Sequence, residues 1–261
     1  MKQPETTVKQ DVRAYLKRIG QEEAGKLDAA LLFELQNSHL HTVPYENLDI
    51  LNRQPLSLEI PDLLDKIVYR QRGGYCFELN ALFGWLLRQL GYTVHDRMAR
   101  FWRQEENVPP KRRHQVLKVE AEGDFYLVDV GVGGIVPRRP IRMIEGLEQV
   151  QGDECYKLER DAEFGWLLCE LKHGSWEWIY SFTEEPQYAK DFIMPSFWCE
   201  HAEDSIFRQG AMLAVRTSSG RNTVAGEEFR IFDDNGVHAF VPKSEDEYKE
   251  ALRKYFNIHL L

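Results

Sequence analysis

The sequence has 261 residues, of which 43% are hydrophobic and 12% aromatic, and its formal net charge is −9 at pH 7. This composition is typical of a folded globular chain, and no apolar run approaches the roughly 20 residues that span a bilayer. The acidic balance argues against nucleic acid as a partner, because a phosphate backbone would be repelled.

The first part of the chain predicts four helices. Apolar residues recur at helical spacing over 12–19 and again over 27–35. Pro61 is well placed to open a third helix, whose apolar residues within 63–68 would face inward. A fourth amphipathic helix is expected over 76–90, where a glycine follows to end it.

After residue 91 the chain changes to short segments that are rich in β-branched and aromatic residues. We expect strands at 93–102, 114–121, 124–131, 164–172, 175–183, 211–217, 228–232 and 237–241. The last two are joined across Asn235-Gly236, a dipeptide that favours a hairpin turn. Ser244 and Glu247 match a capping box at the start of a closing helix.

Segregated helices and strands of this kind are typical of an α+β protein. We expect three subdomains, a helical one over 1–90, a β one over 91–200, and one of strands with a final helix over 201–261. Neither boundary is marked by a linker rich in Pro, Gly or Ser.

The cysteines argue against both a disulfide framework and a structural metal. All four are far apart, with no Cys-x-x-Cys pair and no Cys/His pair at zinc spacing; they are Cys76, Cys155, Cys169 and Cys199. The N-terminus lacks the apolar core of a secretory signal, so we expect a cytoplasmic protein with reduced thiols and no bound metal.

Cys76 follows the turn Arg72-Gly73-Gly74-Tyr75 and stands at the head of the fourth predicted helix. The glycines permit close approach of other groups, and free N–H groups at a helix N-terminus favour a thiolate. Glu78, two residues later, works slightly against this effect. A cysteine between aromatic residues is also typical of a core, so the nucleophile and core readings both stay open at this point.

His114 and Asp129 are candidates for a base and its orienting carboxylate. They flank a predicted hairpin turn, and their separation of 15 residues suits direct cross-strand partners if the turn centres between Ala121 and Glu122. A turn at Gly123-Asp124 would move them out of register. A carboxylate in the strand YLVDVG is costly unless it has a partner, which either a structural or a catalytic hydrogen bond would supply.

Four segments together resemble the arylamine N-acetyltransferases. They are VPYENL at 43–48, RGGYCFE at 72–78, HQVL at 114–117 and DVG at 129–131. The resemblance implies a helical bundle, a β-barrel and an α/β lid, with a site like that of cysteine proteases between the first two. It implies Cys76 as nucleophile, His114 as base and Asp129 as orienting carboxylate, with acetyl-CoA as co-substrate and an aromatic amine or hydrazine as acceptor.

The resemblance also suggests residues around the chemistry. It places Tyr75, Val132, Gly133 and Gly134 beside substrate or CoA. Val132 stands where the family usually has an aromatic residue, so we expect a wider acceptor pocket. Glu46 and Arg72 belong to two of the motifs, and we predict a structural salt bridge between them.

Three functions are weighed. The four segments favour acetyl transfer by a monomer or homodimer without a permanently bound cofactor. The same Cys-His-Asp set would also serve another acyltransferase, an amide synthase or a hydrolase. A non-catalytic binding protein that has kept the fold is the third possibility, and an unreactive Cys76 would identify it.

Overall fold

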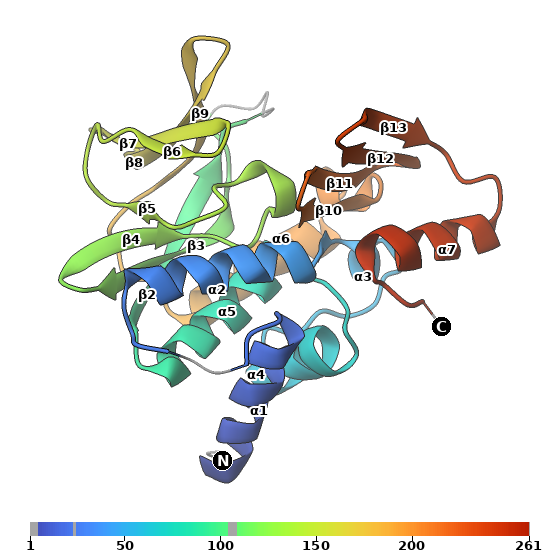
Figure 1. Ribbon diagram of the computed structural model, residues 1–261, viewed down its shortest axis with the longest axis horizontal. Helices are drawn as coiled ribbons and strands as arrows, with labels where there is room; N and C mark the ends of the chain where they lie inside the picture. The colour runs from blue at the N-terminus through green and yellow to red at the C-terminus, as the bar shows by residue number, and fades with distance from the viewer. Residues whose placement is uncertain (1–4, 23–24, 104–108, 261) are drawn as a thin grey trace.

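The structure is a computed structural model that describes residues 5–22, 25–103 and 109–260. Helices come first along the chain, followed by an eight-stranded barrel-like sheet and then by a five-stranded sheet with a closing helix (Figure 1). The α+β class expected from the sequence is therefore confirmed. Within the described residues, no helix is long and apolar enough to cross a membrane.

The helical part is built around α5, which carries Cys76. Its elements are α1 (Glu5–Arg18), α2 (Ala29–Thr42), α3 (Leu48–Leu51), α4 (Ile60–Leu63), the π-helix η1 (Leu64–Tyr69) and α5 (Cys76–Leu90). Gly91 ends α5 in the left-handed conformation, at φ 111°. The helix predicted after Pro61 is regular only as far as Leu63, because the next six residues form a π-helix, a form that periodicity does not reveal.

The eight-stranded sheet packs against α5 through β2 and β3. Its strands are β2 (Thr93–Phe101), β3 (Arg112–Ala121), β4 (Asp124–Val128), β5 (Ile141–Arg142), β6 (Gln149–Gln151), β7 (Glu154–Asp161), β8 (Gly165–Lys172) and β9 (Ser175–Phe182). The order is β5-β4-β3-β2-β9-β8-β7-β6, and a bridge between Glu145 and Leu158 brings the two ends of the sheet close to closure. Residues of the helices and of this sheet share one apolar core.

The C-terminal part lies to one side of the barrel-like sheet and has its own smaller core (Figure 1). It contains β10 (Met212–Thr217), β11 (Gly220–Ala225), β12 (Glu228–Asp233), β13 (Gly236–Phe240) and α7 (Glu245–Phe256). The 3-10 turn η3 (Ala189–Phe192), α6 (Ile193–His201) and the 3-10 turn η4 (Ile206–Arg208) precede it and pack into the main core. Another 3-10 turn, η2 (Gly133–Ile135), lies between β4 and β5. The early strand β1 (Tyr45–Glu46) pairs with β10, so this sheet includes residues from the helical part of the chain.

Local signals account for the end of the chain. The expected hairpin between β12 and β13 forms, but Asp233 pairs with Gly236, so Asp234 and Asn235 are its turn residues, one position earlier than in a regular Asn-Gly turn. The Ser244 side chain accepts the Glu247 N–H and so caps α7. The Glu247 carboxylate accepts the Lys243 N–H, one residue earlier than in a regular capping box.

Candidate active site

Cys76 lies at the first position of α5, and glycines allow its neighbours to approach closely. A Cβ atom at Gly73 would lie 2.1 Å from the carbonyl oxygen of Pro44, and one at Gly131 would lie 2.8 Å from the Cα atom of Cys76. Both positions therefore require glycine on steric grounds. The Cys76 side chain is 3% exposed, and its Sγ atom lies 3.7 Å from the carbonyl oxygen of Arg113.

His114 and Asp129 meet, but not as direct cross-strand partners. The turn between β3 and β4 consists of Glu122 and Gly123, both with positive φ, and the register places Asp129 two residues away from His114. The turn therefore falls between the two positions that the sequence left open. Both side chains still lie on the same face, since residues two apart share a face, and Nε2 of His114 is 2.7 Å from Oδ2 of Asp129.

Two buried amides, neither of them expected from the sequence, fix the Asp129 segment. The Asn80 side chain donates to Oδ1 of Asp129 at 2.9 Å and accepts the Val130 N–H at 3.0 Å. The Gln36 side chain accepts the Asp129 N–H at 3.3 Å. Each amide interrupts an otherwise apolar helix stripe, Asn80 one turn after Cys76, and a polar residue in such a stripe is a signal that could have identified them.

The titration of His114 is set by opposing effects. Burial works to lower the pKa of His114, but the charge and hydrogen bond of Asp129, with a hydrogen bond to Cys76, raise it to about 10. Since Nε2 faces Asp129, Nδ1 is the ring nitrogen left for the thiol. A raised pKa makes the imidazole a stronger base for the Cys76 proton.

The Cys76 thiol is affected in the opposite sense to that expected from its helix position. Burial raises the pKa of the thiol above its ordinary value, while the hydrogen bond and charge of His114 lower it. The net direction is upward, so the desolvation of the thiol outweighs the lowering effect of His114. Ionisation of Cys76 therefore depends on its histidine.

The residues expected beside substrate are held by packing contacts. Tyr75 is fully buried, with its hydroxyl 2.5 Å from Oγ of Ser196 on α6. Val132 is half-buried against the main core. Added Cβ atoms would lie 2.5 Å from Ala214 at Gly133 and 2.6 Å from Arg221 at Gly134, so these two glycines let the C-terminal sheet approach. Contact of these four residues with substrate or CoA stays a prediction.

Arg72 and Glu46 form an ion pair with an additional member. Nη2 of Arg72 lies 2.7 Å from Oε1 of Glu46 and 2.9 Å from Oδ1 of Asp49, and the Glu46 side chain is fully buried. The other carboxylate oxygen of Glu46 accepts the Leu48 N–H. The pair therefore joins the segment before Cys76 to β1 and α3, where the sequence predicted a bracing contact.

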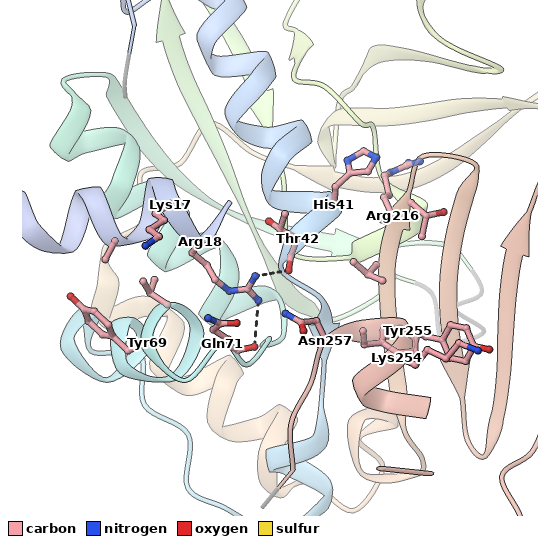
Figure 2. Close-up of a pocket in the computed structure, with 15 residues that line it drawn as sticks. Lys17, Arg18, His41, Thr42, Tyr69, Gln71, Arg216, Lys254, Tyr255 and Asn257 are labelled. Atoms are coloured by element: carbon pink, nitrogen blue, oxygen red, sulfur yellow. Dashed lines mark hydrogen bonds between the residues drawn. The ribbon is translucent and has the colours of Figure 1, made fainter. Parts of the chain in front are cut away.

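A cavity of about 720 Å³ lies between α1, α2, β10 and α7, and the three predicted catalytic residues do not line it (Figure 2). Arg18 crosses one side of this cavity and donates to the carbonyl oxygens of Thr42 and Gln71. The other basic residues lining it belong largely to the last turns of α1, α2 and α7, where cations compensate the helix dipole.

Comparisons with known proteins agree with this architecture. A family model described as N-acetyltransferase matches residues 28–261. The arylamine N-acetyltransferase of Mycobacterium bovis is 33% identical over 255 residues, which cover 96% of this chain and 90% of the relative. The solved arylamine N-acetyltransferase from M. tuberculosis has a TM-score of 0.86 at 33% identity, with 95% of this chain and 93% of that chain covered.

A solved relative also contains CoA. The structure of the Mycobacterium marinum arylamine N-acetyltransferase in complex with CoA has a TM-score of 0.86 at 31% identity, covering 95% of this chain and 92% of that chain. The fold and the matches together define an acetyltransferase. The chain belongs to the arylamine N-acetyltransferase family, as its four sequence segments predicted.

Proposed function

We propose that this protein transfers an acetyl group from acetyl-CoA to the nitrogen of arylamines, arylhydrazines or N-hydroxyarylamines through an acetyl-Cys76 intermediate. The observation that carries the proposal is the arrangement of Cys76, His114 and Asp129 in one buried cluster, in a chain of this family. CoA in the Mycobacterium marinum relative supports acetyl-CoA as the donor.

In the first half-reaction, Sγ of Cys76 attacks the thioester carbonyl carbon of acetyl-CoA while His114 accepts the thiol proton. The tetrahedral intermediate collapses with loss of the CoA thiolate, which takes the proton from His114 and leaves as CoA. Asp129 stays ionised and holds the imidazolium in place. Exchange of one thioester for another has little free-energy cost, so this half-reaction is reversible.

In the second half-reaction, the amine nitrogen attacks the acetyl-Cys76 carbonyl and loses a proton to His114. Cleavage of the C–S bond releases the amide, and the returned proton restores the thiol. Amide formation from a thioester is downhill, which makes the second step effectively irreversible. The smaller Val132 side chain leaves room for the acceptor ring where the family usually has an aromatic residue.

Intact-protein mass spectrometry after brief incubation with acetyl-CoA, without an amine, tests the proposal. We expect a single acetyl adduct on the wild type that aniline discharges, and no adduct on Cys76→Ala. Cys155→Ala is the matched control and should retain the adduct, because Cys155 lies on β7 of the barrel-like sheet. An adduct on Cys76→Ala, or none on the wild type, would overturn the proposal.

A further inference from the structure

Behind the cysteine turn lies a chain of alternating charges that is larger than the predicted Glu46–Arg72 pair. Arg72 bridges Glu46 and Asp49, and Asp49 accepts a second cation, since Nζ of Lys66 lies 2.7 Å from its Oδ2. Nζ of Lys66 also lies 2.8 Å from Oε1 of Glu78. Three carboxylates thus share two cations, and Lys66 joins Glu78 to the part that contains Arg72.

Lys66 is held as a charged group inside the protein. Its side chain is 8% exposed, where a lone ammonium would lose most of its hydration energy. Burial works to lower the pKa of Lys66, but Glu78, Glu46 and Asp49 raise it above its ordinary value. A lysine kept ionised at this depth requires these carboxylates, and the carboxylates in turn require the lysine.

Glu78 links this charge to the nucleophile. Its Oε2 accepts the N–H of Tyr75, the residue directly before Cys76, at 3.1 Å. A Cβ atom at Gly74 would lie 2.9 Å from the same oxygen, so the glycine leaves space for this cap. Burial raises the pKa of Glu78, the charge and hydrogen bond of Lys66 lower it, and the net direction is upward. Lys66 therefore favours the ionised form of the cap.

The segment that supplies Lys66 is itself anchored. Lys66 belongs to the π-helix, a form that is rare and frequent at functional sites. On its other side, Arg18 of α1 donates to the carbonyl oxygens of Ile67 and Gln71, the second of which is visible in Figure 2. Lys66 is therefore held in place by Arg18 through the backbone on one side and by carboxylates on the other, so it can fix the position of Glu78.

We propose that Lys66 is a positioning residue for Cys76, holding Glu78 as a carboxylate against the Tyr75 N–H and so fixing the first turn of α5. This inference rests on the proposed function, because it concerns the same nucleophile. Without Lys66, Glu78 loses the cation that lowers its pKa and keeps the charge of Glu46, which raises it. Arg72 stays paired with Glu46 and Asp49, and Glu200 of α6 also loses the charge of Lys66. The pKa of Glu78 would then rise further, and the protonated carboxyl would be a weaker acceptor.

The groups that act directly on Cys76 come from other elements. They are His114 of β3, Asp129 after β4 and Cys199 of α6. None of them pairs with Lys66, so an additional titration that appears when Lys66 is removed should come from a carboxylate that Lys66 contacts or charges, namely Glu78, Asp49 or Glu200. A variant that lacks both Lys66 and Glu78 shows whether the additional ionisation belongs to Glu78.

The test measures the second-order rate constant of Cys76 alkylation by iodoacetamide from pH 5 to 9, by peptide mass spectrometry and without acetyl-CoA. We expect Lys66→Met to react about ten- to a hundredfold more slowly at pH 7, since small displacements of a reacting group cost this much. Its profile should contain an additional ionisation that the wild-type profile lacks. Lys66→Arg keeps the charge and should retain the wild-type profile.

The double variant Lys66→Met/Glu78→Gln separates positioning from general loss of stability. Its glutamine oxygen still accepts the Tyr75 N–H and does not titrate, so the additional ionisation should disappear and most of the rate should return. If Lys66→Met does not fold, the double variant alone still tests the proposal, because slow alkylation of Cys76 in the double variant would contradict it. Superimposable profiles for Lys66→Met and wild type would also overturn it.

Lys157→Met is the matched control. Lys157 is a half-buried lysine on β7 paired with Glu159, outside the charge chain, and its removal should leave the alkylation profile unchanged. If Lys157→Met slowed Cys76 alkylation as much as Lys66→Met, the inference would be contradicted. Alkylation does not need acetyl-CoA, so a wild type that alkylates but takes no acetyl group would refute the proposed function and leave the role of Lys66 standing.

Discussion

His114 and Asp129 share a 2.7 Å hydrogen bond although they lie two residues out of register across the β3–β4 hairpin. Asp129 lies just past the end of β4, where Asn80 and Gln36 hold it, and its side chain reaches His114 diagonally. The basicity of His114 therefore depends on contacts with α5 and α2 as well as on the hairpin.

We expect Asp129→Asn to slow acetyl transfer about a hundredfold or more. Loss of the carboxylate removes the charge that raises the pKa of His114 to about 10, so the histidine accepts the thiol proton less readily. The pH profile of Cys76 alkylation should move to higher pH. Asp153→Asn, at an 86% exposed side chain, is the control, and identical profiles for Asp129→Asn and wild type would contradict the assignment.

Asn80→Ala tests whether the Asn80 side chain holds the Asp129 carboxylate in place. The substitution leaves the Val130 N–H and the carbonyl oxygen of Gln115 without their buried partner, so we expect a loss of about 2–4 kcal/mol in the free energy of unfolding. Acetylation of Cys76 should also slow, because Asp129 is no longer held. Urea unfolding and the rate of adduct formation check the two effects, and wild-type values in both would rule out this role.

Arg72→Ala should destabilise the protein by about 3–5 kcal/mol, because it leaves the fully buried Glu46 carboxylate without its cation. Arg70→Ala is a close control. Arg70 pairs with Asp65 at the surface, where both side chains are about 60% exposed, so its removal should cost less than about 1 kcal/mol. Similar unfolding free energies for the two variants would show that Arg72 does not brace the cysteine turn.

His39 should make the protein sensitive to acid. This residue is fully buried, and burial together with the charge of Arg18 lowers its pKa to about 3. Its ordinary pKa of about 6.5 applies in the unfolded chain, so its contribution to stability is complete above pH 6.5 and falls as the pH drops toward 3. Between pH 6.5 and 5 the loss amounts to about 2 kcal/mol.

His39→Gln keeps an acceptor for the Tyr15 hydroxyl and should reduce this pH dependence, as measured by urea unfolding at pH 6.5 and 5. His95→Gln, at an exposed position, is the control and should leave the pH dependence of stability unchanged. His114, whose pKa is raised, contributes stability that is complete below pH 6.5 and lost as the pH rises toward 10, so it does not act in the same window. An unchanged pH dependence in His39→Gln would count against the assignment.

Gly131→Ala should prevent acetylation of Cys76. The added Cβ atom would lie 2.5 Å from Nδ2 of Asn80 and 2.8 Å from Cα of Cys76, so the Asp129 segment must move away from α5. Gly25→Ala meets nothing within 4 Å and should change the unfolding free energy by less than about 0.5 kcal/mol. Normal adduct formation in Gly131→Ala would show that the close approach is dispensable.

Some elements could not be expected from their residues alone. The strand β7, ECYKLERD, is mostly polar or charged, and α6 contains Pro195 in its first turn, so neither has a clear local signal. Both form because neighbouring strands and the buried Cys199 side of α6 provide packing partners. Tertiary contacts outweigh weak local preference in such segments.

The sequence by itself determined the helix that begins at Cys76, the hairpin at Asn235-Gly236 and the order of helices before strands. These features depend on periodicity, glycine and turn chemistry within a few residues, which any single chain displays. The four motif segments also determined the family. Their distinctive residue pattern can be read without knowing what each side chain contacts.

Only the tertiary structure decided which groups act together. Lys66 and Glu78 are 12 residues apart, and Asn80 and Asp129 are 49 apart, so no local preference pairs them. The diagonal meeting of His114 with Asp129 depends on where the turn falls, and the raised pKa of the Cys76 thiol depends on burial by distant elements. Long-range packing sets desolvation and hydrogen-bond partners, and these in turn set the chemistry of the site.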